Sequence, residues 1–433
     1  MSATLIGLIA IIVFLILIFL GMNVGLALLL VGFAGYAFMV NPTAAIGLLR
    51  KVPATQASTY ALIVIPLFIL MGNFGYHAGL SRALYRAGYS WLSWLPGGLA
   101  AGTVAASAGF GAICGSCAAT CATMGTIALP EMRRYRYADR LSTGSIAMGG
   151  TLGILIPPST PMIIYCIMAE ESIGKQFIAG ILPGIMLTIL TIITIVLMVK
   201  LRPSWAPAPG RASWRERLAS LKGLWGVVVL FGAVLGGMFS GFFSVNQSAA
   251  VGAFLALLLM AVNRNLNWRS FIMAVKDTVT TFAMTFLIII GASVFSNFLA
   301  ITKLPLRLAD ALQSMDVSFG VVLIIMTMIY IVLGMLMDEL PMIMLTVPIF
   351  LPIVQSYGVN FIWFGIYIIL VMELGAIVPP VGLNCFIIHG VARDISLGTI
   401  YKGALPFVAT ILMAVVIIYL FPDIVMFLPN LIG

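Results

Sequence analysis

Long, uninterrupted runs of apolar residues recur along the whole chain. Examples are the segments 5–22, 181–199, 224–243, 321–337 and 361–378. Each run is about 20 residues long, which is enough for an α-helix to cross roughly 30 Å of hydrocarbon. Because the runs are continuous rather than alternating with polar residues, they predict transmembrane helices and not the strands of a membrane barrel.

Composition strengthens this prediction. Of the 433 residues, 62% are hydrophobic and only 8% are charged, whereas a soluble domain carries roughly 25% charged residues. We therefore expect an all-α polytopic membrane protein whose main solvent is lipid. The first apolar run has no basic residues before it and is longer than the core of a signal peptide, so we interpret it as a retained helix.

Short motifs recur at a fixed distance and indicate an internal repeat. Leu129-Pro130 recurs 222 residues later as Leu351-Pro352. At the same offset, Gly153 and the pair Pro157-Pro158 recur as Gly375 and Pro379-Pro380. Both halves also have the same order of elements: two helices, a third helix with a short amphipathic arm, an interrupted apolar segment, a helix broken at Pro-Pro, and a final helix.

The interrupted segments are too long for one membrane span and too short for two, so each predicts a re-entrant hairpin. Each half then has five full crossings, about ten in total, plus one hairpin. An odd number of crossings inverts the second half, and inverted repeats are typical of secondary transporters. The expected divisions are a first repeat at 1–200 (helices about 4–22, 24–40, 59–78, arm 79–94, hairpin 97–130, broken helix 138–171, helix 175–200), a cytoplasmic linker at 201–222, and a second repeat at 223–433 (helices about 223–242, 246–263, 279–301, arm 302–314, hairpin 317–353, broken helix 359–392, helix 403–427).

The net charge of +9 is better explained by membrane topology than by nucleic-acid binding, because Lys and Arg collect in cytoplasmic loops. If the loop 131–140 is cytoplasmic, 17 of the 22 basic residues lie inside and 5 outside, with both termini outside. The five outer residues are Arg50, Lys51, Lys175, Lys303 and Arg307.

Four breaks in apolar helices, two in each half, carry the functional prediction. Broken backbone in a bilayer must be buried in protein or line a wet cavity. Free carbonyls can then coordinate sodium, and the start of a half-helix favours an anion. In the first break, Ser116 and Thr120 offer side-chain oxygens; in the second, we expect Thr160 to be an N-cap with Pro161 at the first helical position. A single Pro-Pro or Gly motif can merely kink or pack a helix, but four matched breaks favour a site.

Three acids lie in deeply apolar sequence next to the third and fourth breaks: Asp338, Glu339 and Glu373. Ionisable groups at membrane depth are functional candidates. Asp338 either contacts sodium or substrate, or only caps the returning half-helix. For Glu373 we expect a partner within the bundle, and for Glu339 contact with water.

Other classes of function are disfavoured. No metalloprotease H-E-x-x-H or hydrolase elbow motif is present, so we expect no enzyme and no organic cofactor. Cys114-x2-Cys117 has the spacing of half a metal site, but no second pair exists, so we expect no transition metal and treat the cysteines as packing residues. A channel normally repeats around a central pore, whereas inverted halves suit alternating access.

Several motifs, in this order along the chain, are specific. They are IPLFILMGN at 65–73, LPGGLA at 95–100, GAICGS at 111–116, IPPSTPM at 156–162 and VPPVGLNCF at 378–386. Together they resemble the large membrane subunit, the DctM-like large permease, of TRAP (tripartite ATP-independent periplasmic) transporters, nearly from end to end.

The resemblance implies a sodium-coupled secondary importer of the bacterial inner membrane with an elevator-type fold. It implies a separate small four-helix membrane subunit, a periplasmic substrate-binding protein, and a small organic anion as substrate: a C4-dicarboxylate, a sugar acid or a sulfonate. The alternative is a stand-alone ion-coupled carboxylate carrier of similar fold that needs no binding protein.

Residues of the family's sites carry over onto matching positions. The resemblance implies sodium binding at Gly115, Ser116, Gly150, Gly153 and Pro157, and at Gly334, Asp338, Gly375 and Pro379. It implies substrate binding near Ser116, Thr120, Ser159, Thr160 and Asn384. The first hairpin tip departs from the serine-rich family pattern, because Cys114 and Cys117 flank Gly115-Ser116; backbone ligation survives this change, but hydroxyl ligation at 114 and 117 does not.

Overall fold

A computed structural model describes residues 2–207, 210 and 212–432. Every regular element in these residues is a helix, and none is a strand, as the apolar runs predict. The first part of the chain, up to the linker, consists of α1 (Ala3–Phe19), α2 (Val24–Met39), α3 (Pro42–Ser58), the short turn η1 (Tyr60–Ile63), α4 (Val64–His77), α5 (Leu80–Leu92), α6 (Gly98–Cys114), α7 (Cys117–Arg134), α8 (Asp139–Leu155), α9 (Thr160–Ala169), α10 (Ile173–Leu201) and η2 (Pro203–Trp205).

The remaining elements follow a closely similar order. The amphipathic arms α5 and α16, the hairpins α6–α7 and α17–α18, and the broken helices α8–α9 and α19–α20 occur where the repeat predicts them. The elements are α11 (Trp214–Lys222), α12 (Trp225–Phe231), the π-helical turn η3 (Gly232–Gly236), α13 (Gly237–Phe239), α14 (Val245–Val262), α15 (Trp268–Thr302), α16 (Leu304–Ser314), α17 (Phe319–Gly334), α18 (Glu339–Ser356), α19 (Phe361–Ile377), α20 (Leu383–Val391), α21 (Leu397–Leu420) and α22 (Asp423–Ile432).

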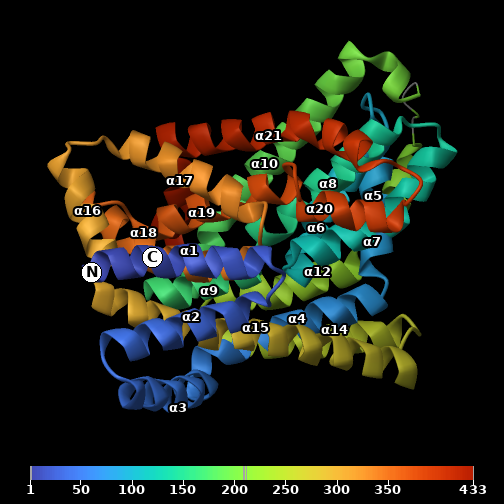
Figure 1. Ribbon diagram of the computed structural model, residues 1–433. Coiled ribbons are helices and arrows are strands. Elements are labelled where there is room, and N and C mark those ends of the chain that lie inside the picture. Colours follow the sequence, from blue (N-terminus) through green and yellow to red (C-terminus); the bar gives the residue numbers. More distant parts are fainter. Residues whose placement is uncertain (1, 208–209, 211, 433) are drawn as a thin grey trace.

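The helices form two layers (Figure 1). In the first, α15 packs against α2 and α4, and α4 packs against α14; we call these four helices the scaffold layer. In the second, α8 packs against α6, α7 and α21, while α18 packs against α9 and α19; we call α6–α9 and α17–α21 the hairpin body. Both chain termini lie at the end of the molecule that carries α16 (Figure 1).

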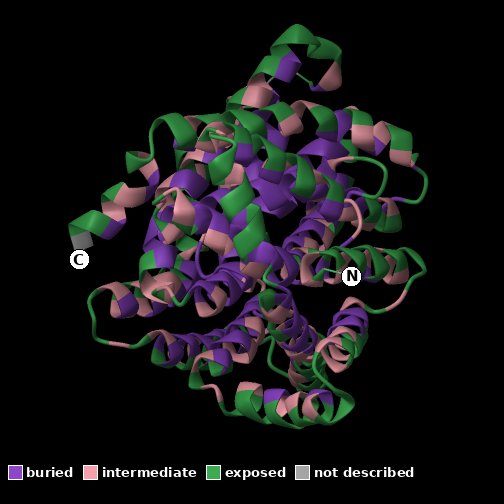
Figure 2. Ribbon diagram, turned by 60° about the vertical axis from the view of Figure 1, so that its left-hand side comes forward, coloured by how far each residue is buried: buried purple, intermediate pink, exposed green. Residues whose placement is uncertain are grey.

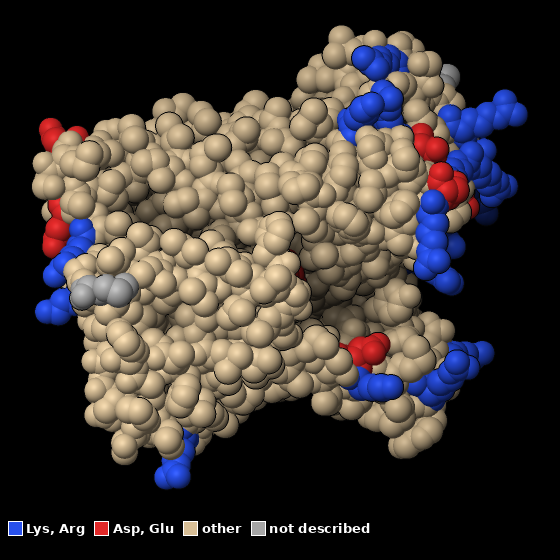
Figure 3. Space-filling view, viewed as in Figure 1, with Lys and Arg blue, Asp and Glu red and all other residues tan. Residues whose placement is uncertain are grey.

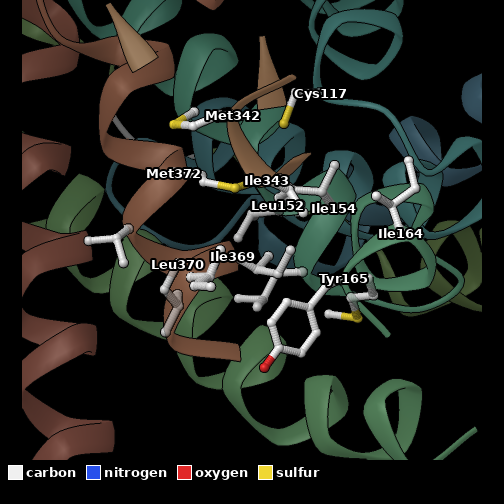
Figure 4. Close-up of a cluster of buried hydrophobic side chains, with 14 of the residues drawn as sticks. Cys117, Leu152, Ile154, Ile164, Tyr165, Met342, Ile343, Ile369, Leu370 and Met372 are labelled. Carbon is white, nitrogen blue, oxygen red and sulfur yellow. The ribbon is translucent and has the colours of Figure 1, made fainter. Parts of the chain in front are cut away.

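The hairpin body holds most of the tightly buried core. Nearly every residue of α8 and of α19 is buried, and Figure 2 shows buried residues filling the interior of this layer. The two halves of the chain meet there: Leu152 of α8 and Tyr165 of α9 lie beside Ile343 of α18 and Ile369 of α19 (Figure 4). This apolar contact holds the first broken helix against the second hairpin and the second broken helix.

Within the described residues, six helices are long and apolar enough to cross a membrane, or eight if two bent pairs each count as one span. Of the ten predicted crossings, α1 and α2 have only 17 and 16 residues, or about 25 Å at 1.5 Å per residue. The broken helix α8–α9 bends by 41° at its break. The predicted spans are therefore present as helices, but several are short or broken.

The structure differs from the predicted elements in two places. Helix α3 was not predicted. In the second half, the single 35-residue helix α15 takes the place of α3 and α4 together. It begins at Trp268, earlier than the expected residue 279. The first half bends instead at Thr59, where the hydroxyls of Ser58 and Thr59 both donate to the Thr55 carbonyl at 2.9 Å and compete with the helical hydrogen bonds. The final helix, expected at 403–427, is two helices because Pro422 cannot continue α21.

We expect Gly291→Ala to destabilise the scaffold layer. A Cβ at Gly291 would lie 2.2 Å from the Gly25 carbonyl oxygen of α2, so the two helices would have to separate, at a cost of about 1–3 kcal/mol. The midpoint of thermal unfolding of the purified protein should fall. Gly47→Ala is the matched control, because a Cβ there meets no atom within 4 Å; an equal loss in both variants would contradict this account of the packing.

Candidate functional site

The first hairpin turns at Gly115 and Ser116. Gly115 ends α6 with φ +60°, a left-handed conformation that glycine adopts without strain. Ser116 is extended and caps α7, its hydroxyl accepting from the Ala119 N–H at 3.4 Å. Two half-helices thus end and begin within two residues, as the cluster of small residues predicts.

The first broken helix is interrupted at 156–159. Pro157 and Pro158, joined by a cis peptide bond, follow the end of α8. The N-cap of α9 is Ser159, whose hydroxyl accepts from the Met162 N–H at 3.4 Å. The prediction that Thr160 is the cap with Pro161 first in the helix is wrong by one residue, because Thr160 already has helical backbone and Pro161 is the second helical residue.

Glycine contacts bring the first hairpin tip onto the break of the first broken helix, α8–α9. A Cβ on Gly111 would lie 2.2 Å from the Cα atom of Gly153, so only glycine permits this approach. A Cβ on Gly115 would lie 3.2 Å from the Pro158 carbonyl oxygen and 3.5 Å from the Thr160 nitrogen. Backbone polar groups of the two breaks therefore face each other at close range.

The second half repeats this arrangement. A Cβ on Gly334 would lie 2.7 Å from the Cα atom of Gly375, the counterpart of the Gly111–Gly153 contact. Asp338, 222 residues after Ser116, is the N-cap of α18 and accepts from the Glu339 N–H at 2.9 Å. Asp338 therefore caps the returning half-helix, and its contact with an ion or substrate stays a prediction.

The two broken helices differ in their surroundings. Residues 157–160 are buried, whereas Pro379, Pro380 and Val381 are exposed. The Tyr401 hydroxyl lies 2.7 Å from the Pro380 carbonyl oxygen and 2.6 Å from that of Val381, which satisfies carbonyls that the break leaves free. Figure 3 shows a hollow between the two layers, with acidic atoms at its inner end, that opens toward the end where most Lys and Arg residues gather.

A cavity of about 150 Å³ lies between the two hairpin tips and the scaffold layer. Gly115 and Ser116 line it from the first tip and Asp338 from the second, and Thr160 lines it from the start of α9. The other lining residues are Ile69, Gly72, Asn73, Cys114, Ala119, Pro161, Thr281, Thr285, Glu339 and Leu340. Hydroxyl, amide and carboxyl groups from both layers therefore converge on one space.

A second, smaller chamber of about 20 Å³, enough for about one water-sized particle, shares Asp338 and Glu339 with the first. Gly334, Glu373 and Asn384 also line it. The Asn384 side chain donates to the Ala147 carbonyl at 3.1 Å, while its oxygen, like Oε1 of Glu373, is buried without a hydrogen-bond partner. Oε2 of Glu373 lies 3.9 Å from the thiol of Cys117.

The predicted site residues fall into two groups. Those that line the cavities are Gly115, Ser116, Thr160, Gly334, Asp338 and Asn384. The others lie behind them or in the breaks: Thr120, Gly150, Gly153, Pro157, Ser159, Gly375 and Pro379. Thr120 is fully buried and donates to the Ser116 carbonyl at 2.8 Å, so it holds the tip together rather than facing the cavity.

Sequence reasoning did not identify the scaffold residues of the cavity. Asn73 of α4 donates to the Thr278 hydroxyl of α15 at 2.8 Å, and Thr281 and Thr285 lie one and two turns further along α15. These residues were recognisable in the sequence only as isolated polar residues in apolar helices. Nothing in the sequence, however, places α4 and α15 opposite the hairpin tips.

A larger cavity of about 470 Å³ lies elsewhere between the layers. The scaffold side contributes Ser293, Ser296 and Asn297 of α15, and Gln56 of α3 donates to Ser293 at 3.0 Å. Apolar residues of α9 and α18 form its other wall. Its described lining residues include none from the two hairpin tips or the two Pro-Pro breaks, so it lacks the backbone groups that make the smaller cavity a candidate ion and substrate site.

An ion pair joins the two halves of the hairpin body. Arg133, at the end of α7, lies 2.5 Å from Asp394, between α20 and α21. This hydrogen bond from the Arg133 guanidinium lowers the pKa of the Asp394 carboxyl. The ion pair thereby joins the first hairpin to the second broken helix at the end of α7 and just after α20, in addition to their contacts at the site.

The sequence matches the family model described as "Tripartite ATP-independent periplasmic transporter, DctM component" over residues 11–424. The chain belongs to this TRAP family. The C4-dicarboxylate TRAP transporter large permease protein DctM of Pseudomonas aeruginosa is 34% identical over 86% of this chain and 87% of its own. The sialic acid TRAP transporter large permease protein SiaM of Vibrio cholerae is 30% identical over 96% of both.

The fold also resembles a solved one. The YdaH transporter of Alcanivorax borkumensis superposes with a TM-score of 0.62, covering 90% of this chain and 89% of that protein, at 15% identity. The two proteins therefore share a fold. The TRAP large permeases are transport proteins and not enzymes, and the chain accordingly has a transport role.

We expect the TRAP permease cavity to be reachable from the hollow. Ala119 is exposed and lines the cavity, whereas Ala112 is 1% exposed. With Cys114, Cys117 and Cys121 replaced by serine, a small, charged thiol reagent should therefore modify Ala119→Cys much faster than Ala112→Cys, as measured by mass spectrometry. Equal labelling of the two positions would mean that the first tip is not arranged around the cavity as described.

Proposed function

We propose that this TRAP large permease is the transporting subunit of a sodium-coupled importer that carries a small organic anion across the bacterial inner membrane. Family membership establishes the role of permease. The sodium coupling, the substrate class and the elevator movement are our proposal, and they rest chiefly on one observation. Both hairpin tips and the start of α9 meet at a single cavity between the two layers.

Sodium binding is supported by the chemistry of the breaks. Where a helix is interrupted, backbone carbonyls have no helical partner, and hard cations such as sodium favour oxygen ligands. On our proposal one ion binds at Gly115, Ser116, Gly150, Gly153 and Pro157. The other binds at Gly334, Asp338, Gly375 and Pro379, where the Asp338 carboxylate adds a charge.

Anion binding is supported by the orientation of the half-helices. Helices α7 and α9 both begin at the cavity, at Cys117 and Thr160. Their first N–H groups and the positive ends of their dipoles favour a carboxylate. Ser116, Ser159, Thr160 and Asn384 remain our candidate substrate residues, with Thr120 in a supporting position.

An elevator movement is supported by the two-layer architecture. The arms α5 and α16 connect helices α4 and α15 of the scaffold layer to the hairpins. The hairpin body is held together by glycine contacts and by the Arg133–Asp394 ion pair, which suits movement as one unit. For coupling, sodium must bind the substrate-loaded state more tightly than the empty one.

The partners on this proposal are a small four-helix membrane subunit and a periplasmic substrate-binding protein. The TRAP family works with both. We test the proposal by reconstituting the two membrane subunits in proteoliposomes and measuring uptake of labelled acids with and without the binding protein, under an inward sodium gradient. Uptake that needs sodium and the binding protein would support the proposal; uptake that needs only sodium would favour the stand-alone carrier, and uptake indifferent to sodium would exclude the coupling.

We expect Asp338→Asn to raise the sodium concentration for half-maximal uptake by about tenfold or more, since interactions with charged groups contribute about 1.5–3 kcal/mol. Asparagine is also a good N-cap, so α18 should still be capped and the variant should fold. Asp310→Asn, an exposed change on α16, is the control. An unchanged sodium dependence in Asp338→Asn would show that Asp338 only caps the helix.

A further inference from the structure

The charged side chains that line the two neighbouring chambers are all acidic. Three carboxyl groups line them, those of Asp338, Glu339 and Glu373. No Lys, Arg or His is among the lining residues that the structure describes. The ion pairs of the described residues lie elsewhere, between Arg133 or Arg134 and Glu131, Asp139 or Asp394. A substrate with two negative charges would therefore lie beside three carboxyl groups and would find no Lys, Arg or His side chain among the described lining residues to pair with.

The three acids do not serve one ion. Among the described residues, no group of three or more carboxylate, thiol or imidazole side chains is placed to hold a metal ion. Asp338 is the residue that our proposed function gives to sodium. Glu373 lines the small chamber and is 1% exposed, and its Oε1 has no hydrogen-bond partner. This leaves Glu339, which lines both chambers, as the acid that faces the substrate space without an assigned cation.

On the side of the first hairpin tip, the cavity of about 150 Å³ is lined by hydrogen-bond donors instead of acids. Ser116 and Thr160 line it there, at the starts of α7 and α9. N–H groups and helix dipoles favour a negative group at this place. The cavity thus offers donors for an anion on one side and a carboxylate on the other, within a volume of about 150 Å³. This volume is smaller than the roughly 300–1,000 Å³ of typical drug-sized sites.

We propose that the substrate of this permease is a small zwitterion, with its carboxylate at the starts of α7 and α9 and its cationic group at Glu339. The inference rests on the proposed function and revises its substrate from an organic anion to a carboxylate that also carries a cationic group. A cationic amine or amidinium supplies the partner that the lining residues lack. Asp338 and Glu339 stand at the start of α18, whose dipole offsets part of their charge; the cationic group of the substrate completes the compensation at Glu339.

Ligands matched in length test the inference. We would reconstitute the large and small subunits in nanodiscs and measure binding by calorimetry, with sodium and without it. The probes are three pairs that differ only in one end group: 3-aminopropanoate and malonate, 4-aminobutanoate and succinate, 5-aminopentanoate and glutarate. We expect at least one zwitterion to bind about tenfold or more tightly than its dianion partner in sodium, the effect of one charged interaction.

The variant Glu339→Gln separates a role in recognition from a role in folding. It keeps the size and hydrogen-bonding capacity of the side chain and removes the charge. We expect it to weaken zwitterion binding by about tenfold or more while leaving dianion binding unchanged or stronger. Asp310→Asn should change neither affinity. An equal loss for both ligand types in Glu339→Gln would overturn the assignment of the cationic group to Glu339.

The outcomes distinguish this inference from the proposed function. If no zwitterion binds more tightly than its dianion partner, the zwitterion inference is overturned whether or not the dianions bind. If dianions bind in a sodium-dependent manner and the zwitterions do not bind more tightly, the proposed function stands with its organic-anion substrate. If sodium changes neither ligand binding nor the labelling of Ala119→Cys, the sodium-coupled function fails together with the inference.

Discussion

Backbone polar groups cannot be left unpaired in a bilayer, and the architecture of this TRAP permease depends on that constraint. Four helices are interrupted, and the interruptions are enclosed within the protein or face its internal hollow. Two glycine pairs, Gly111–Gly153 and Gly334–Gly375, permit this enclosure, because they let a hairpin tip touch the neighbouring broken helix without an intervening side chain. The unpaired carbonyl and N–H groups that the breaks create are thereby confined to the place where they can bind an ion or a substrate.

The same contacts relate the fold to function. A hairpin tip on a helix break forms an oxygen-rich pocket next to the positive ends of half-helices, which is a combination suited to a cation and an anion together. The apolar cluster around Leu152, Tyr165, Ile343 and Ile369 holds the pockets of both halves in one body. The scaffold layer contributes the opposite wall of the cavity through Asn73, Thr281 and Thr285. Binding and movement can therefore be coupled because the site lies at the boundary between the two layers.

The two halves are not equivalent. The break of α8–α9 is buried and Ser159 caps α9, whereas the break of α19–α20 is exposed and the Tyr401 hydroxyl pairs with its carbonyls. Where the first tip has Ser116 and Cys117, the second has Asp338 and Glu339 at the matching positions. The two repeats thus present a neutral side, rich in hydrogen-bond donors, and an acidic side to the same cavity. The distinction between these sides carries the inference about the substrate.

The sequence by itself determined the class of protein, the order of the elements and the positions of the breaks. Apolar runs, Pro-Pro pairs and glycines act locally on the chain, so the hairpins, the arms and the repeat could be predicted to within a few residues. Local errors remained where side-chain hydrogen bonds decide the details, as at Thr59 and at the Ser159 cap. Only the tertiary structure decided which residues share the cavity. Thr120 turned inward to the Ser116 carbonyl, Asn73 and Thr285 joined from distant helices, and Glu373 came to lie beside Cys117, because these placements depend on how whole helices pack and leave no periodic signal in the sequence.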